Sequence, residues 1–232
     1  MVIAGFQPLS LLDYPSKSSS IVFTQGCPFR CPYCHNPELI STRPQTSIAE
    51  ESVLTYLQKH TQMLDGVCIT GGEPTIQVGL RAFIERVRDL GLLVKLDTNG
   101  SHPKCIREFI ADKLVDYFAM DLKAPWEKYR DVVRVGGIGN VNTAIQCRET
   151  LDIIQTSGVD HEFRTTICPG VHTAADFFEM AGYLKDGETY FIQETRFNKT
   201  LVSDLPRDVG FHAIDLTVKL REKFPRLTIE SR

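Results

Sequence analysis

Short apolar runs alternate with helical patterns along this 232-residue chain, and this alternation limits the folds that it can adopt. Brief runs rich in β-branched or aromatic residues predict strands over 20–24, 66–70, 92–97, 116–121, 161–167 and 188–193, and a terminal strand could cover 227–230. Helices are predicted over 47–60, 79–90, 103–113, 142–156, 174–184 and 209–224, the first beginning at Ser47 with Glu50 completing a capping box. Such βα units build a parallel sheet, either open and doubly wound or part of a (β/α) barrel.

Polar and glycine-rich segments follow these expected strands. In both topologies ligands bind at the carboxyl ends of the strands. The segments at those ends are 26–36, 70–75, 97–100, 121–123 and 193–194, while Arg164 lies within the fifth strand. We therefore expect these segments to converge on one face and to form one site.

The overall composition is that of an ordinary globular chain. Hydrophobic residues make up 42% and charged residues 24%, which is typical of water-soluble folded proteins. A net charge of -3 provides no basic footprint for nucleic acid. The first residues lack the pattern of a signal peptide, and no apolar run is long enough to span a membrane. Free thiols in such a chain predict a reducing, cytoplasmic location.

Cys27, Cys31 and Cys34 form a C-x3-C-x2-C triplet. Three thiolates in one loop can hold a 4Fe–4S cluster, which normally takes four cysteine ligands. The loop supplies three, so one iron would remain open to another ligand. A structural zinc site prefers four N/S ligands, often in two close pairs, and no second pair follows here. An iron–sulfur site is therefore favoured over zinc or inert thiols, and the odd count of seven cysteines argues against a disulfide framework.

Charged residues at the strand ends indicate the ligand. Glu73 offers a carboxylate to an ammonium group, after a Gly71-Gly72 pair that would let a backbone edge approach a ligand closely. Asp121 and Lys123 should point to the same side as an internal ion pair or as ligand contacts. Arg164 has apolar flanks, and a buried guanidinium needs an anionic partner. The implied ligand is zwitterionic at one end and has an adenosine-like body, as a methionine-like compound bound to the open iron would.

With this triplet, the chain resembles the radical S-adenosylmethionine (SAM) superfamily. Members of that superfamily have an aromatic residue before the last cysteine of the triplet, and here that residue is Tyr33. The activating enzymes of glycyl-radical proteins are the most similar group. They share the motifs found here at 34–36 (Cys-His-Asn), 71–74 (Gly-Gly-Glu-Pro), 97–100 (Asp-Thr-Asn-Gly) and 121–123 (Asp-Leu-Lys). The opening Ser10–Pro15 is most similar to the anaerobic ribonucleoside-triphosphate reductase activating proteins, and the similarity spans about residues 8–200.

This resemblance implies an α/β fold, a partial (β/α)6 TIM-like barrel. It would form a single radical SAM domain over 1–232, with an extension over 1–18, a core over about 19–200 and a C-terminal helix and strand over 205–232. Cys27, Cys31 and Cys34 would ligate one 4Fe–4S cluster. Gly71, Gly72 and Glu73 would hold the methionyl amino group of SAM. The other cofactor contacts would be Tyr33, Asn36, Asp97, Thr98, Asn99, Asp121, Lys123 and Arg164, and the acidic pair could hold a monovalent cation.

The implied activity is the reductive cleavage of SAM to a 5′-deoxyadenosyl radical, which takes a hydrogen atom from a glycine of a partner enzyme. The expected partner is anaerobic ribonucleotide reductase, with flavodoxin or ferredoxin as the one-electron donor. Asp13 falls in the stretch that faces the partner's glycine loop in relatives, although Pro15-Ser16 replaces their usual Pro-Gly, and Gln193 stands where some relatives have histidine. The alternatives are a small-molecule enzyme resembling 7-carboxy-7-deazaguanine synthases, or the activating enzyme of pyruvate formate-lyase.

Overall fold

A computed structural model describes residues 1–43, 46–134, 143–208 and 210–232. Eight strands form one sheet in chain order: β1 (Ile3–Ser10), β2 (Ser19–Thr24), β3 (Gly66–Gly71), β4 (Leu93–Thr98), β5 (Tyr117–Asp121), β6 (Asp160–Thr166), β7 (Thr189–Gln193) and β8 (Thr228–Ser231). β1 pairs antiparallel with β2, and every later pair is parallel. Within the described ranges β1 and β8 are the two edges of the sheet, so the predicted partial barrel is confirmed.

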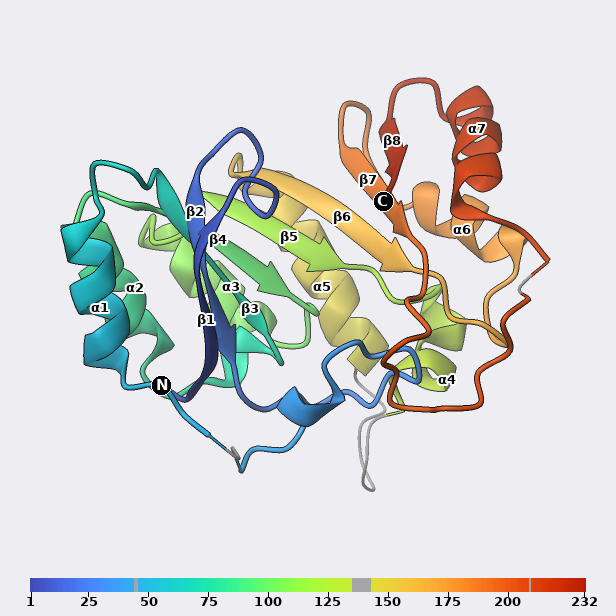
Figure 1. The fold of residues 1–232 in the computed structure, drawn as a ribbon. Coiled ribbons are helices and arrows are strands. Elements are labelled where there is room, and N and C mark those ends of the chain that lie inside the picture. Colours follow the sequence, from blue (N-terminus) through green and yellow to red (C-terminus); the bar gives the residue numbers. More distant parts are fainter. Residues whose placement is uncertain (44–45, 135–142, 209) are drawn as a thin grey trace.

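Helices connect the parallel strands. They are α1 (Glu50–Lys59), α2 (Leu80–Asp89), α3 (Pro103–Ala111), α4 (Tyr129–Val133), α5 (Thr143–Thr156), α6 (Ala174–Ala181) and α7 (Ala213–Lys223), with short 3-10 turns η1 (Pro37–Leu39), η2 (Pro74–Ile76) and η3 (Trp126–Lys128). Figure 1 shows α1, α2, α3 and α5 along one side of the sheet, and α6 and α7 beside β7 and β8. None of the helices in the described ranges combines the length and apolarity needed to cross a bilayer.

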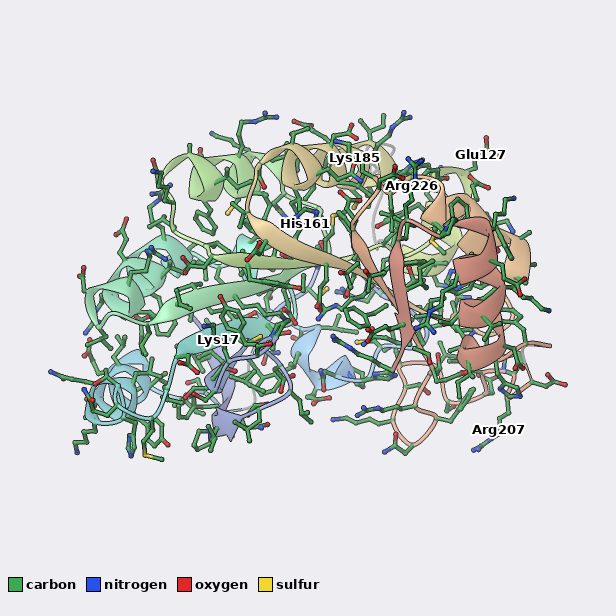
Figure 2. All side chains as sticks on the ribbon, turned by 90° about the horizontal axis from the view of Figure 1, so that it is seen from above. Lys17, Glu127, His161, Lys185, Arg207 and Arg226 are labelled. Carbon is green, nitrogen blue, oxygen red and sulfur yellow. The ribbon has the colours of Figure 1, made fainter. Side chains whose placement is uncertain are left out.

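The core lies between the sheet and these helices. Val67, Val94 and Phe118 on successive strands are fully buried, and Phe83 and Val87 of α2 pack in the same apolar cluster. Strands that are covered on both sides read as continuous apolar runs, and this explains why their positions were predictable from sequence. Seen from above, side chains fill the space between helices and strands, while Glu127 and Arg207 project outward at the periphery (Figure 2).

The prediction missed β1. Its residues were assigned to an extension before the core, but they form an edge strand that pairs with β2 from Ile3↔Thr24 to Ser10↔Ser19. Gly5 and Pro8 interrupt the strand pattern, and proline is tolerated in a sheet mainly at such an edge, where one side of the strand needs no partner. The terminal strand expected over 227–230 is present as β8.

Two helix predictions need correction. α1 begins at Glu50 and not at Ser47, because Ala49 is its N-cap and supplies no side-chain hydrogen bond. Glu50 instead accepts a hydrogen bond from the N-terminal amine of Met1 at 2.9 Å, so the predicted capping box is wrong. The short α4 was not predicted, since five residues carry too little periodicity to reveal a helix. The expected starts at 142 and 209 lie outside the described residues, but 210–212 are described and are not helical, so α7 begins at Ala213, later than expected.

Candidate functional site

A cavity of about 580 Å³ opens at the carboxyl ends of the parallel strands. Every residue predicted above to hold the cluster or SAM contributes to its lining: Cys27, Cys31, Tyr33, Cys34, Asn36, Gly71, Gly72, Glu73, Asp97, Thr98, Asn99, Asp121, Lys123 and Arg164. The end of each strand from β2 to β6 thus supplies part of one wall. Asp13, Gln193 and Glu194 line the cavity as well.

The three cysteines lie on the loop between β2 and η1. Its backbone is anchored where Gly26 and Cys27 donate hydrogen bonds to the carbonyls of Leu39 and Ile40, at 2.7 and 3.1 Å. Burial raises the pKa of Cys27 to about 12 and that of Cys31 to about 11, and it also raises the pKa of Cys34. Metal binding requires thiolates, so the assembly of a cluster on this loop would release protons.

A segment that follows β7 packs across the cysteine loop. His35 Nε2 accepts a hydrogen bond from the backbone N–H of Arg196 at 3.1 Å, and Val202 donates its N–H to the carbonyl of Pro32 at 3.0 Å. His35 therefore anchors the covering segment. The sequence could not reveal this contact, because His35 and Arg196 are 161 residues apart.

The two glycines after β3 allow one chain segment to approach another. A Cβ at Gly72 would lie 2.1 Å from the carbonyl oxygen of Gly26, and a Cβ at Gly71 would lie 2.4 Å from the backbone nitrogen of Thr24. Gly71 also has a φ of 109°, which disfavours other residues. The close approach that the structure shows is to the backbone of β2 and of the cysteine loop, and both glycines also line the cavity, so their role beside a ligand stays a prediction.

Glu73 is fully buried and joins the ends of β3 and β4. Its Oε1 accepts hydrogen bonds from the backbone and hydroxyl of Thr75 and from the Thr98 hydroxyl, at 3.1, 2.5 and 2.8 Å. Its Oε2 accepts one, from the Asn99 N–H at 2.7 Å. Burial outweighs these donors and raises the pKa of Glu73. Since a carboxylate oxygen has about two acceptor positions, Oε2 can take one further donor from the cavity.

Asn99 links this segment to the cysteine loop. Its Nδ2 lies 3.8 Å from Cys27 Sγ, and its Oδ1 accepts the N–H of Ser101 at 2.9 Å, which fixes the orientation of the amide. Hydrogen bonds to the sulfurs are one of the ways in which proteins tune an iron–sulfur cluster.

A network of alternating charges crosses the sheet at the floor of the cavity. Arg164 donates from Nε to Asp121 Oδ1 at 2.9 Å and from Nη1 to Asp97 Oδ2 at 3.0 Å. Lys123 Nζ lies 2.8 Å from Asp121 Oδ2, and Lys95 Nζ lies 2.5 Å from Asp97 Oδ1. Asp121 and Lys123 thus form the internal ion pair that was one of the alternatives, and both line the cavity, so a contact with a ligand stays a prediction.

This network keeps its members charged although they are buried. Burial alone raises the pKa of both carboxyl groups, but Arg164 with Lys95 at Asp97, and Lys123 with Arg164 at Asp121, outweigh it and lower both pKa values. For Lys95 burial alone lowers the pKa, but Asp97 outweighs it and the pKa ends above its usual value. Lys95 was missed by sequence reasoning; the available signal was a lysine within the apolar run of β4, two residues before Asp97 and so on the same side of the strand.

The cavity wall that contains the three cysteines also contains Tyr33 and Lys123. Within the described part of the chain, no three His, Cys, Asp or Glu side chains are grouped closely enough to ligate one ion. Tyr33 lies in the same wall, with its hydroxyl buried and without a partner among the described residues, and the Lys123 ammonium is 5.7 Å from its ring centre.

His172 contacts the backbone of Lys123, which lines the cavity. Its Nδ1 accepts the N–H of Cys168 at 2.9 Å, and its Nε2 lies 2.9 Å from the carbonyl oxygen of Lys123, so the ring is neutral with its proton on Nε2. Burial lowers the pKa of His172 to about 4. The sequence offered this residue only as a turn position after Gly170.

We therefore expect His172 to make the protein acid-sensitive. A pKa of about 4 in the folded state, against 6.5 in the unfolded chain, means that its contribution is complete above pH 6.5 and is lost as the pH falls toward 4. Between pH 7 and pH 5 the free energy of unfolding should fall by about 2 kcal/mol from this group. His172→Gln keeps a donor but cannot titrate, and urea unfolding of both proteins at the two pH values should show a weaker dependence in the variant. Equal dependence would contradict the assignment.

Comparisons with known proteins agree with this geometry. Residues 21–183 match the family model described as the Radical SAM superfamily. A Methanocaldococcus jannaschii protein provisionally named glycyl-radical enzyme activating enzyme MJ1227 is 35% identical over 196 residues, which cover 83% of this chain and 79% of that protein. A 7-carboxy-7-deazaguanine synthase of Methanopyrus kandleri is 31% identical over 132 residues, 48% of this chain and 52% of that protein.

Solved structures share the fold. The structure of Streptococcus suis SuiB bound to S-adenosylmethionine superposes with a TM-score of 0.68 at 14% identity, covering 91% of this chain and 49% of that one. At this level of identity the likeness concerns the fold alone.

Proposed function

Because the chain belongs to the radical SAM superfamily, we propose that it is an activating enzyme that removes a hydrogen atom from a glycine of a partner protein and leaves a glycyl radical there. The observation that carries this proposal is the extent of the likeness to the M. jannaschii activating enzyme, which covers 83% of this chain and 79% of that protein. The gathering of every predicted motif around one cavity supports it.

In this proposal Cys27, Cys31 and Cys34 hold a 4Fe–4S cluster at the cavity wall, and the cavity holds SAM. When bound and reduced by an external donor such as flavodoxin or ferredoxin, this pair supplies the one-electron cleavage chemistry of the superfamily. The chain positions both groups and excludes water from them. Asn99, at 3.8 Å from Cys27, adds a hydrogen bond to one thiolate.

The chain orients the cofactor by charge. Glu73 lines the cavity and its Oε2 accepts a single hydrogen bond, so an amino group could bind there with Gly71 and Gly72 beside it. Lys123 and Arg164 present positive charge to a carboxylate. The other proposed contacts also line the cavity: Tyr33, Asn36, Asp97, Thr98, Asn99 and Asp121.

The partner that we propose is anaerobic ribonucleotide reductase. The likeness of Ser10–Pro15 to the activating proteins of that enzyme supports this choice. Asp13 lines the cavity, and the neighbouring Leu11 and Leu12 are 71% and 87% exposed, as a segment that meets another protein would be. Ser16 has a φ of 58°, so it adopts the backbone conformation for which relatives use glycine.

A second candidate is a small-molecule enzyme like the 7-carboxy-7-deazaguanine synthases. Its support is the 31% identity to the M. kandleri enzyme, but that match covers only 48% of this chain. A pyruvate formate-lyase activating enzyme would use the same chemistry on another protein, so it differs only in the partner.

The test combines anaerobically reconstituted protein, a reductant, SAM and anaerobic ribonucleotide reductase from the same genome. We expect an electron paramagnetic resonance doublet from a glycyl radical on the reductase, and none when the target glycine is replaced by alanine. 5′-Deoxyadenosine in the quenched sample without a doublet would reject this partner but retain the radical chemistry, and pyruvate formate-lyase or the deazaguanine precursor would be tried next. If neither product forms while the cluster is intact, the proposed function is wrong.

A further inference from the structure

Each carboxylate oxygen of the acidic pair at the cavity floor, Asp97 and Asp121, already has a cationic partner. The two oxygens of Asp97 are paired with Lys95 and Arg164, at 2.5 and 3.0 Å. The two oxygens of Asp121 are paired with Arg164 and Lys123, at 2.9 and 2.8 Å. A monovalent cation at this pair would have to share these oxygens with nitrogen donors and lie close to three positive side chains.

Lys95 is the unusual member of this set. Its side chain is 2% exposed on β4, and among the described residues its ammonium group has three neighbours: Asp97, the Cys68 sulfur at 3.9 Å and the face of Tyr117, whose centre is 6.0 Å away. A buried ammonium of this kind needs a fixed anion, and Asp97 is that anion. The ammonium therefore occupies a position at the carboxylate where a hydrated or partly dehydrated alkali ion could otherwise bind.

The charge balance agrees with the distances. Two carboxylates, Asp97 and Asp121, face three cationic side chains, Lys95, Lys123 and Arg164. The other charged group packed against the network is Glu162, which lies 3.9 Å from Arg164 and 3.5 Å from Arg232, a further cation. Counted with Glu162 and Arg232, the set holds three carboxylates and four cationic side chains, so its negative charge is balanced without any added ion.

We infer that the Lys95 ammonium replaces the monovalent cation expected at the acidic pair, so that SAM binding by this chain requires neither sodium nor potassium. The inference rests on the proposed function, because it concerns the same cofactor site. It makes Lys95 a positioning residue that acts through Asp97.

The test measures SAM affinity, which a merely structural ion pair would not make cation-dependent. Reconstituted protein is titrated with SAM by calorimetry in potassium, sodium and tetramethylammonium chloride at equal ionic strength. The dissociation constant of the wild type should agree within about twofold in the three salts. Lys95→Met, which removes the charge but keeps a long side chain, should bind about tenfold more weakly in tetramethylammonium and recover in sodium or potassium. Lys104→Met, at a lysine whose side chain is 92% exposed, is the matched control and should behave as the wild type.

The outcomes separate clearly. A wild type that loses affinity about tenfold without alkali ions overturns the inference, whatever the variants do. A Lys95→Met protein that is insensitive to the salt overturns the role of Lys95. If Lys95→Met does not fold, Lys95→Arg is used, because it keeps a cation beside Asp97. Lys95→Arg should bind SAM equally in all three salts. A requirement of this variant for sodium or potassium would contradict the inference. Absence of SAM binding in every salt would instead reject the proposed function itself.

Discussion

Replacing Cys31 with alanine should prevent assembly of the cluster and abolish the cleavage of SAM. Cys31 is 7% exposed and lines the cavity with Cys27 and Cys34, so its loss would leave two thiolates for a group that depends on three from this loop. The iron content after anaerobic reconstitution should fall from about four per chain to a small fraction of that value. 5′-Deoxyadenosine should not accumulate under reducing conditions.

Cys105→Ala provides the matched control. Cys105 is a half-buried free cysteine on α3 and does not line the cavity, so its removal should leave iron content and SAM cleavage unchanged. Full iron content with retained cleavage in the Cys31 variant would disprove the assignment of the triplet. Loss of iron in both variants would indicate a general folding defect and would be checked by circular dichroism.

Arg164→Leu should be the most destabilising single change in the cavity. Its guanidinium holds Asp97 and Asp121 together from one buried position, and removing it leaves two carboxylates short of a partner. The expected loss is about 3 kcal/mol in the free energy of unfolding, because each carboxylate keeps its lysine but one buried oxygen of each is left without a donor. Urea unfolding measures this loss, and SAM binding should weaken with it.

An exposed ion pair supplies the comparison. Arg107 and Glu149 are 2.7 Å apart but 62% and 48% exposed, so Arg107→Leu should cost less than about 1 kcal/mol. Arg164→Lys keeps a charge but cannot bridge both carboxylates as a guanidinium does, and its stability should fall between the wild type and Arg164→Leu. A similar cost for Arg107→Leu and Arg164→Leu would show that burial does not set the strength of the Arg164 network.

Local sequence was enough to predict most of the sheet and the residues around the cavity. Buried parallel strands are continuous apolar runs, and the strand positions fix which loops meet at their carboxyl ends. Cys27, Glu73, Asp97 and Asp121 were therefore expected at one face, and the structure brings them to one cavity. The family resemblance added what residue types alone could not, namely the identity of the cofactor.

The edge strand β1, the helix α4 and the start of α1 escaped prediction because their local patterns are short or are interrupted by glycine and proline. Tertiary structure was needed to reveal the partners of the buried polar groups. A lysine within an apolar strand is unusual already in the sequence, but only the fold shows that the Lys95 ammonium pairs with Asp97.

What the sequence by itself determined is thus the order of strands and helices and the set of chemical groups at one end of the sheet, since both follow from local periodicity and spacing. What only the tertiary structure decided is how those groups are paired. Arg164 meets Asp121 and Asp97 across 43 and 67 residues of chain, and His35 meets Arg196 across 161. A buried charge or donor pairs with the group that folding places beside it. The sequence around the buried residue does not identify that partner, because the partner is distant in the chain.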